Sequence, residues 1–175
     1  MDPCIKLAKK AIKHYLLTGE IIEAPQNLPQ QILTKRAGVF VCFKNKKQLR
    51  GCIGTFSPAY KNIAEEIIQN TISAATQDPR FLPVKAGELN DLKITIDILS
   101  GPQKVENEKI SQLDHRKFGV IVKSEKGRKT GLLLPNLEGV NSVDEQIYIA
   151  CQKAGIDPKS EKFHVYKFEV ERHEE

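Results

Sequence analysis

The sequence GVFVCFKNKKQLRGCIG, residues 38–54, decides the fold of the first half of the chain. Its first apolar segment, 39–43, contains only valine, phenylalanine and cysteine, which favour strands or pack in cores. A polar, basic turn follows at 44–47, and a second apolar segment ends at Ile53. The pattern predicts a β-hairpin whose centre is buried on both faces.

A turn centred near Lys46 and Lys47 places Cys52 roughly opposite Cys42. Directly opposed residues of antiparallel strands have Cβ atoms about 5 Å apart, so the two thiols are expected to be neighbours. In a cytoplasmic protein such a pair normally stays reduced. The sequence leaves open whether the two cysteines act as a redox pair.

A second stretch, GVIVKSEKGRKTGLLLP at 119–135, matches the first without a gap, so that Gly38 aligns with Gly119 and the basic turns coincide. In each copy a helix follows, beginning at a capping box, and a strand of alternating pattern comes next. The capping boxes begin at Asn62 and Ser142, and the strands cover 93–99 and 163–170.

The matching order of elements favours an internal duplication of a hairpin–helix–strand unit, at about 38–100 and about 118–170. Chance is the alternative, because all hairpins share turn chemistry. An amphipathic helix is predicted at 3–17 and an irregular connection at 20–37. The prediction is a single α+β domain over 1–175, with a mainly antiparallel sheet covered by helices.

Composition excludes some classes of protein. The chain has 175 residues, is 40% hydrophobic and carries a net charge of +5. It has no apolar run of about 18 residues and no apolar signal-peptide core, so a cytoplasmic protein without membrane contact is expected. The basic runs at 44–47 and 126–129 coincide with predicted turns, which favours solvated turns over a nucleic-acid site. The four cysteines form no C-x-x-C pair and have no histidine at a zinc-like spacing, so neither metal nor cofactor is predicted.

The motif LRGCIGT, residues 49–55, combines residues suited to a site. Gly51 would let another element or a ligand approach the backbone, and Gly54 could bulge the strand and redirect Thr55. Arg50 offers two parallel donors to a carboxylate or phosphate, and its charge would favour the thiolate of Cys52. The alternative is that Cys52 fills the core.

The segment TQDPRFLPV, residues 76–84, follows the first predicted helix and could return to either end of the hairpin. Asp78 can bind backbone donors or an arginine, and Phe81 can anchor the loop. A purely structural ion pair of Arg50 with Asp78 or Glu88 is the alternative to a functional role.

The chain resembles the AMMECR domain family over about residues 3–170. The motifs that carry the resemblance are LRGCIGT, the helix and DPRFLPV after it, and the later GVIV and GLLLP. The resemblance implies an α+β fold with an internal duplication and no settled activity. The chain is similar to component A of the prokaryotic AmmeMemoRadiSam system, whose other two components are a Memo-type protein and a radical-SAM protein. The functional patch that it implies consists of Arg50, Gly51, Cys52, Gly54, Thr55, Asp78, Arg80 and Phe81.

Three functions follow as hypotheses. The first is an accessory protein that binds a Memo-type or radical-SAM partner through the patch around Arg50 and Phe81. The second is a cysteine-dependent enzyme in which Cys52 is the nucleophile or redox thiol, Arg50 lowers its pKa, and Cys42 or His164 is the second participant. The third is RNA or anion binding by the basic turns. The sequence leaves open whether the protein is an enzyme.

Overall fold

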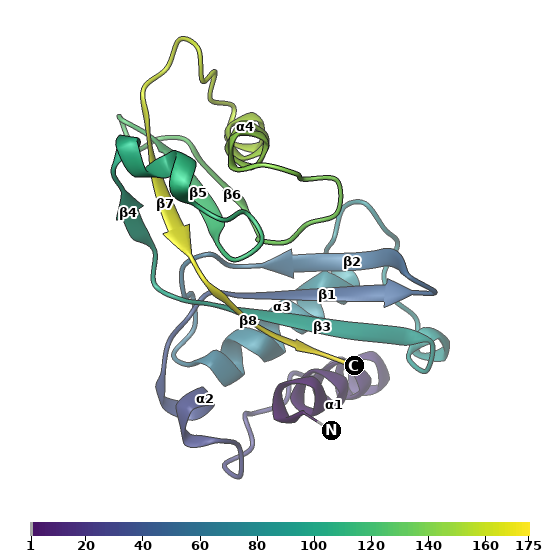
Figure 1. Ribbon diagram of the computed structural model, residues 1–175. Coiled ribbons are helices and arrows are strands. Elements are labelled where there is room, and N and C mark those ends of the chain that lie inside the picture. The colour runs from purple at the N-terminus through teal and green to yellow at the C-terminus, as the bar shows by residue number, and fades with distance from the viewer. Residues whose placement is uncertain (1) are drawn as a thin grey trace. The chain divides into compact units, whose positions relative to one another are not determined.

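The computed structural model describes residues 2–175, which form two compact units. Of the described residues, unit 1 comprises 2–99 with Glu171–Glu175, and unit 2 comprises Ser100–Val170. Each unit contains helices and a four-stranded sheet (Figure 1). The predicted α+β class is therefore confirmed, and the strands are divided between two sheets.

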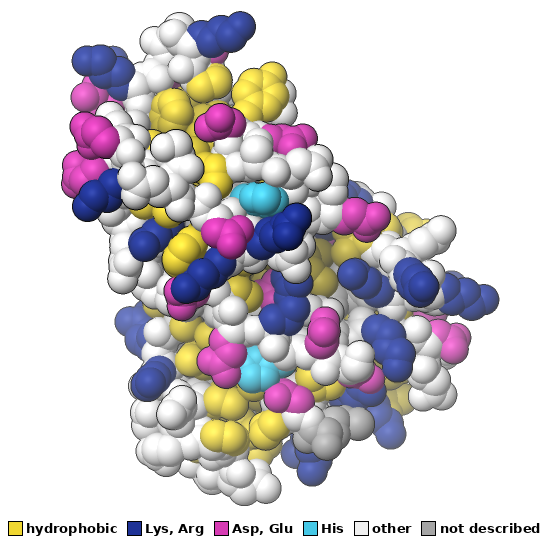
Figure 2. Space-filling model, viewed as in Figure 1, with side chains coloured by type: hydrophobic (Ala, Val, Ile, Leu, Met, Phe, Trp, Pro, Cys, Tyr) yellow, Lys and Arg dark blue, Asp and Glu magenta, His cyan; other side chains and the backbone are white. Residues whose placement is uncertain are grey.

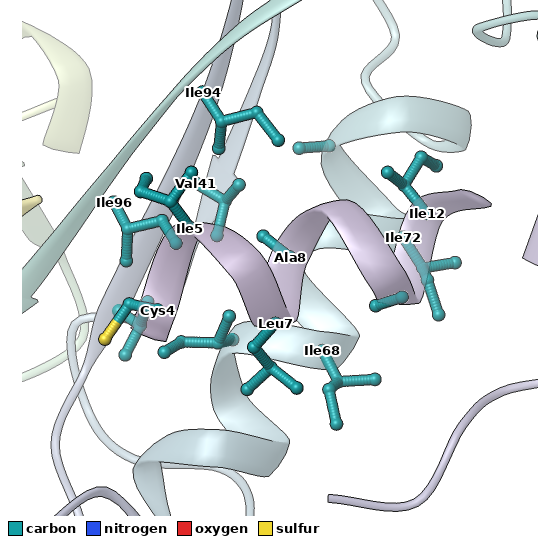
Figure 3. Close-up of a cluster of buried hydrophobic side chains, with 14 of the residues drawn as sticks. Cys4, Ile5, Leu7, Ala8, Ile12, Val41, Ile68, Ile72, Ile94 and Ile96 are labelled. Atoms are coloured by element: carbon teal, nitrogen blue, oxygen red, sulfur yellow. The ribbon is translucent and has the colours of Figure 1, made fainter. Parts of the chain in front are cut away.

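The sheet of unit 1 has the strand order β2-β1-β3-β8. Its strands are β1 (Val39–Asn45), β2 (Gln48–Gly54), β3 (Leu92–Leu99) and β8 (Val170–Glu174). The helices α1 (Pro3–Thr18) and α3 (Ile63–Thr76) cover one face of the sheet (Figure 1). Figure 3 shows their apolar side chains packed with those of β1 and β3 in one core.

Helix α1 begins and ends where the sequence provides caps. The carboxylate of Asp2 accepts hydrogen bonds from the backbone N–H groups of Cys4 and Ile5, and Gly19 ends the helix with φ of 76°. The predicted irregular connection after it is partly wrong, because a short helix, α2 (Gln30–Thr34), forms within it and buries Ile32.

The first hairpin has the predicted register, with Cys42 opposite Cys52. Lys46 and Lys47 form its turn with φ of 46° and 71°, which are the left-handed values that a two-residue hairpin turn requires. The register shifts beside Phe43, where Arg50 is the extra residue of a bulge. The predicted bulge at Gly54 is wrong, because Gly54 pairs in register and leaves room for the ring of Phe40.

The sheet of unit 2 has the order β4-β7-β5-β6. Its strands are β4 (Gln103–Val105), β5 (Gly119–Ser124), β6 (Thr130–Leu133) and β7 (Phe163–Phe168). Helix α4 (Val143–Ala154) begins at the predicted cap Ser142 and packs on β5 and β6. The 3-10 helix η2 (Asn107–Gln112) and strand β4 were not predicted.

The two units place corresponding elements in the same order. In each sheet a hairpin's first strand lies between its second strand and the strand that follows the helix. This parallel agrees with the sequence repeat, and a duplication by descent stays a prediction. The single strand expected at 163–170 is wrong, because the chain leaves one sheet after Phe168 and β8 begins at Val170 beside β3.

The single domain expected over 1–175 also stays a prediction beside this division into two units. Among residues 2–175, no helix has the length and apolar character needed to cross a membrane.

Candidate functional site

The DPRFLPV loop returns to strand β2 and is fixed there by Asp78. This carboxylate is almost fully buried, at 4% exposure. One oxygen, Oδ2, accepts a hydrogen bond of 2.8 Å from the backbone N–H of Cys52. The other, Oδ1, accepts from the backbone N–H of Arg80 at 3.1 Å. A single side chain therefore ties the loop to β2 at Cys52. The sequence had left open to which end of the hairpin the loop returns.

Arg80 completes this arrangement. Its guanidinium donates to both oxygens of Asp78, at 2.9 and 2.7 Å, and to the carbonyl of Cys52 at 3.3 Å. The hydrogen bond from Arg80 lowers the pKa of Asp78 far below its ordinary value, against the opposing effect of burial. The same guanidinium lies 5.5 Å from the ring centroid of Phe81.

Arg50 holds the other end of the loop. Its guanidinium makes a two-bond ion pair with Glu88, at 2.9 and 3.0 Å, and donates to the carbonyl of Leu82 at 2.9 Å. The carboxylate of Glu88 also accepts from the backbone N–H of Lys85. The hydrogen bond from Arg50 lowers the pKa of Glu88. Glu88 lies in the short helix η1 (Ala86–Glu88), which the sequence did not predict.

The structure thus pairs Arg50 with Glu88, one of the two partners considered for it, and pairs Asp78 with Arg80. Their charges are used to hold the backbone of residues 78–88 against β2. This loop presents one large apolar side chain to solvent, since Leu82 is 82% exposed. Leu82 was absent from the predicted patch, although an apolar residue between Phe81 and Pro83 in a stiff loop was a usable signal.

The cysteines of the hairpin are joined by a Cys42–Cys52 disulfide. Cys52 is partly exposed, so it is not the fully buried filler considered as the alternative. The two cysteines outside the disulfide are buried, and burial raises the pKa of both the Cys4 thiol, to about 12, and the Cys151 thiol. His164, the other predicted participant, lies in unit 2 opposite Lys123 of β5.

The remaining motif residues contact the protein's own chain. A Cβ atom added to Gly51 would lie 2.2 Å from the carbonyl oxygen of Ala74, so the element that approaches this glycine is α3. The hydroxyl of Thr55 donates to the fully buried carboxylate of Glu66 and accepts from Asn70. Glycine here permits close packing of strand and helix, and Thr55 belongs to a buried polar network.

The comparisons with known proteins agree with this architecture. The model of the AMMECR1 family matches residues 5–173, across both units. A Thermotoga maritima protein is 47% identical over 98% of this chain and 97% of its own length. A Clostridium acetobutylicum protein is 49% identical over 99% of this chain, which spans only 36% of that longer protein. The crystal structure of an uncharacterised Pyrococcus horikoshii protein superimposes with a TM-score of 0.89 and 35% identity, covering 98% of this chain and 89% of that one.

Proposed function

Since the chain belongs to the AMMECR1 family, we propose that it is an accessory protein that binds a Memo-type or radical-SAM protein partner. The binding surface in this proposal is the loop Arg80–Phe81–Leu82–Pro83, called the Leu82 loop below. The partner classes come from the resemblance of the motifs, and the surface comes from the geometry around Arg50 and Asp78.

The observation that carries the proposal is the exposure of Leu82 on a backbone that is held in place. At 82% exposure the side chain of Leu82 contributes little to the stability of the fold. The backbone carbonyl of Leu82 nevertheless accepts a hydrogen bond from the guanidinium of Arg50. A loop that is ordered before binding loses less conformational entropy when a partner covers it. Arg80 and the half-buried Phe81 beside it are residue types enriched at protein interfaces.

The charges of the site also favour binding over acid–base catalysis. Arg50 and Glu88 neutralise each other, as do Asp78 and Arg80, and both carboxyl pKa values are lowered rather than moved toward neutrality. A general acid or base works best with a pKa near the operating pH. These four side chains therefore suit a scaffold that positions the Leu82 loop.

The test is co-purification with the Memo-type and radical-SAM proteins of the same organism. Leu82→Asp places a charge in the proposed interface and should reduce retention of the partner at least about tenfold, because one desolvated charge costs more than 1.4 kcal/mol. Leu17→Asp is the matched control, since Leu17 is also exposed, at 66%, but lies at the end of α1. Failure of the unaltered protein to retain either partner, or equal retention by both variants, would refute the proposal.

The Cys42–Cys52 disulfide supports a second candidate, a dithiol–disulfide exchange protein. In that reaction two thiols of a partner become a disulfide as the Cys42–Cys52 bond breaks and both sulfurs gain a proton. Mass spectrometry of the native protein in a series of glutathione buffers should show reversible gain of two hydrogen atoms. A pair that stays in one state in all buffers while the protein remains folded would exclude this candidate.

The third hypothesis, RNA or anion binding, has weaker support. Lys129 of the second basic turn pairs with Glu161 at 2.6 Å. In the view of Figure 2, acidic side chains are interspersed among the lysines and arginines. Clustered charge of one sign is the usual mark of a nucleic-acid surface, so this hypothesis ranks last.

A further inference from the structure

The beginning of α1 and strand β8 bring an aspartate, a cysteine and a histidine together within unit 1. Asp2, Cys4 and His173 each offer one metal-binding atom, and these atoms all lie within 4.8 Å of one another. Ligands of a tetrahedral metal ion with bonds of about 2.0–2.3 Å lie about 3–4 Å apart, so small movements would seat one ion among them.

Each oxygen of Asp2 has a different partner. Oδ1 accepts hydrogen bonds from the backbone N–H groups of Cys4, at 2.8 Å, and Ile5, at 3.2 Å. Oδ2 lies 2.9 Å from Nδ1 of His173. The cap at the start of α1 therefore fixes the carboxylate and directs its second oxygen toward the histidine and away from the helix.

Cys4 belongs to the buried hydrophobic cluster of unit 1, with 1% of its surface exposed. In Figure 3 its sulfur points away from the other labelled side chains of the hydrophobic cluster. The carboxylate of Asp2 lies within 4.8 Å of this thiol. The sulfur therefore has negative charge nearby, and a cation would be attracted there.

His173 provides a separate observation. Its side chain is 15% exposed, and its Nε2 atom is buried without a hydrogen-bond partner in the described structure. The carboxylate of Glu171 is 3.4 Å from this atom. An Asp–His ion pair explains Nδ1 only. It does not explain the thiol of Cys4 beside the pair, and Nε2, although it lies within ion-pair distance of Glu171, makes no hydrogen bond among the described residues.

We propose that Asp2, Cys4 and His173 bind one divalent transition-metal ion, with Zn²⁺ the best match. Thiolate, imidazole and carboxylate are the three ligand types of protein zinc sites, whereas Ca²⁺ and Mg²⁺ prefer oxygen alone. Nδ1 of His173, which faces Asp2 at 2.9 Å, is the ring nitrogen that would serve as its ligand. Glu171, whose carboxylate lies 3.4 Å from Nε2, would then hold the other ring nitrogen of His173. On binding, the Cys4 S–H bond breaks, its proton passes to solvent, and a sulfur–metal bond forms.

The site joins residues from the two ends of the described chain, 2–4 and 171–173, and it is independent of the Leu82 loop. A metal that binds the folded chain and not the unfolded one raises the melting temperature by mass action. The role of the bound metal ion is thus structural, because it would link β8 to the start of α1 and stabilise unit 1 without taking part in catalysis.

The test is titration of the metal-free protein with Co²⁺ without reductant, so that the Cys42–Cys52 disulfide stays closed. We expect one equivalent to bind, with a thiolate-to-Co²⁺ charge-transfer band and tetrahedral d–d bands that Zn²⁺ abolishes. Cys4→Ser should lose the charge-transfer band, and His173→Asn should weaken binding at least about 10–100-fold. The controls Cys151→Ser and His164→Asn should leave the charge-transfer band and the affinity for Co²⁺ unchanged.

A folded protein without a saturable charge-transfer band would overturn the proposal, as would a band that survives Cys4→Ser. X-ray absorption of the zinc-loaded unaltered protein gives a measurement that does not depend on whether variants fold. One sulfur at about 2.3 Å with nitrogen and oxygen ligands at about 2.0–2.1 Å is expected. A shell without sulfur, or with two or more sulfurs, would contradict the assignment.

Discussion

Asp78 shows how one side chain can determine the conformation of a loop. Its carboxylate binds the backbone of Cys52 and the guanidinium of Arg80, and it is buried at 4% exposure. Removing one partner of such a pair leaves a buried polar group without its hydrogen bond. This lowers the stability of the fold more than replacing both partners by apolar groups would.

We predict that Asp78→Asn lowers the free energy of unfolding by about 2 kcal/mol at pH 7, because the charge-assisted bonds to Arg80 are lost. The pKa of Asp78 is lowered in the folded state, so its contribution is complete above the unfolded-state pKa of about 3.9 and declines as the pH falls below it. Urea unfolding at pH 7 and pH 3 should show the difference between the proteins shrinking at the lower pH.

Glu20→Gln is the control for this measurement, because the side chain of Glu20 is 80% exposed. Its effect should stay within about 0.5 kcal/mol at both pH values. A deficit of Asp78→Asn that is equally large at pH 3 would contradict the ion-pair explanation.

At the scale of elements, a strand and a helix approach each other closely at a glycine in each unit. A Cβ atom on Gly51 of β2 would lie 2.2 Å from the carbonyl oxygen of Ala74 in α3. In unit 2 a Cβ atom on Gly131 of β6 would lie 2.1 Å from the carbonyl oxygen of Ala150 in α4. Both obstacles are backbone atoms, so no side-chain rotation can relieve them, and each helix would have to move.

We predict that Gly51→Ala and Gly131→Ala each lower the free energy of unfolding by about 2–3 kcal/mol, the cost of overpacking a tight contact. Denaturant unfolding of the two variants measures it. Gly87→Ala is the matched control, since an added Cβ atom meets nothing within 4 Å there, and it should be neutral or stabilise by a few tenths of a kcal/mol. Equal stability of all three variants would show that the helices are free to shift.

At the scale of the whole molecule, the segment Glu171–Glu175 completes unit 1 from the far end of the chain. Arg172 makes a two-bond ion pair with Asp97 of β3, at 2.7 and 2.8 Å, and Asp97 is 3% exposed. Lys9 of α1 binds Glu175 at 2.6 Å. These contacts join the last residues to a strand 75 positions earlier and to a helix 166 positions earlier in the chain.

We predict that Arg172→Met lowers the free energy of unfolding by about 2–3 kcal/mol, because the carboxylate of Asp97 stays buried without its partner. The ion pair Lys61–Glu65 is the control, as the lysine side chain is 77% exposed. Lys61→Met should change stability by less than about 1 kcal/mol in the same chemical unfolding experiment. Similar effects of both substitutions would mean that Asp97 gains other partners when Arg172 is absent.

The sequence by itself determined the local structure. The alternating residues of β1, the capping residues Asn62 and Ser142, and Gly155 at the end of α4 act on neighbours within a few positions, so the elements and the Cys42–Cys52 register could be predicted. The motif also lies on strand β2, against which the DPRFLPV loop is held. The family followed from the same motifs, because they cover most of the chain.

Only the tertiary structure decided which distant groups meet. The choice of Glu88 for Arg50, the split of the last strand between two sheets, and the exposure of Leu82 depend on how elements pack. The approach of His173 to Cys4 is the extreme case, since nothing in the sequence relates two residues at opposite ends of the chain. Capping and strand alternation are short-range effects of the backbone, whereas such pairings depend on the burial of whole faces, which the sequence encodes only collectively.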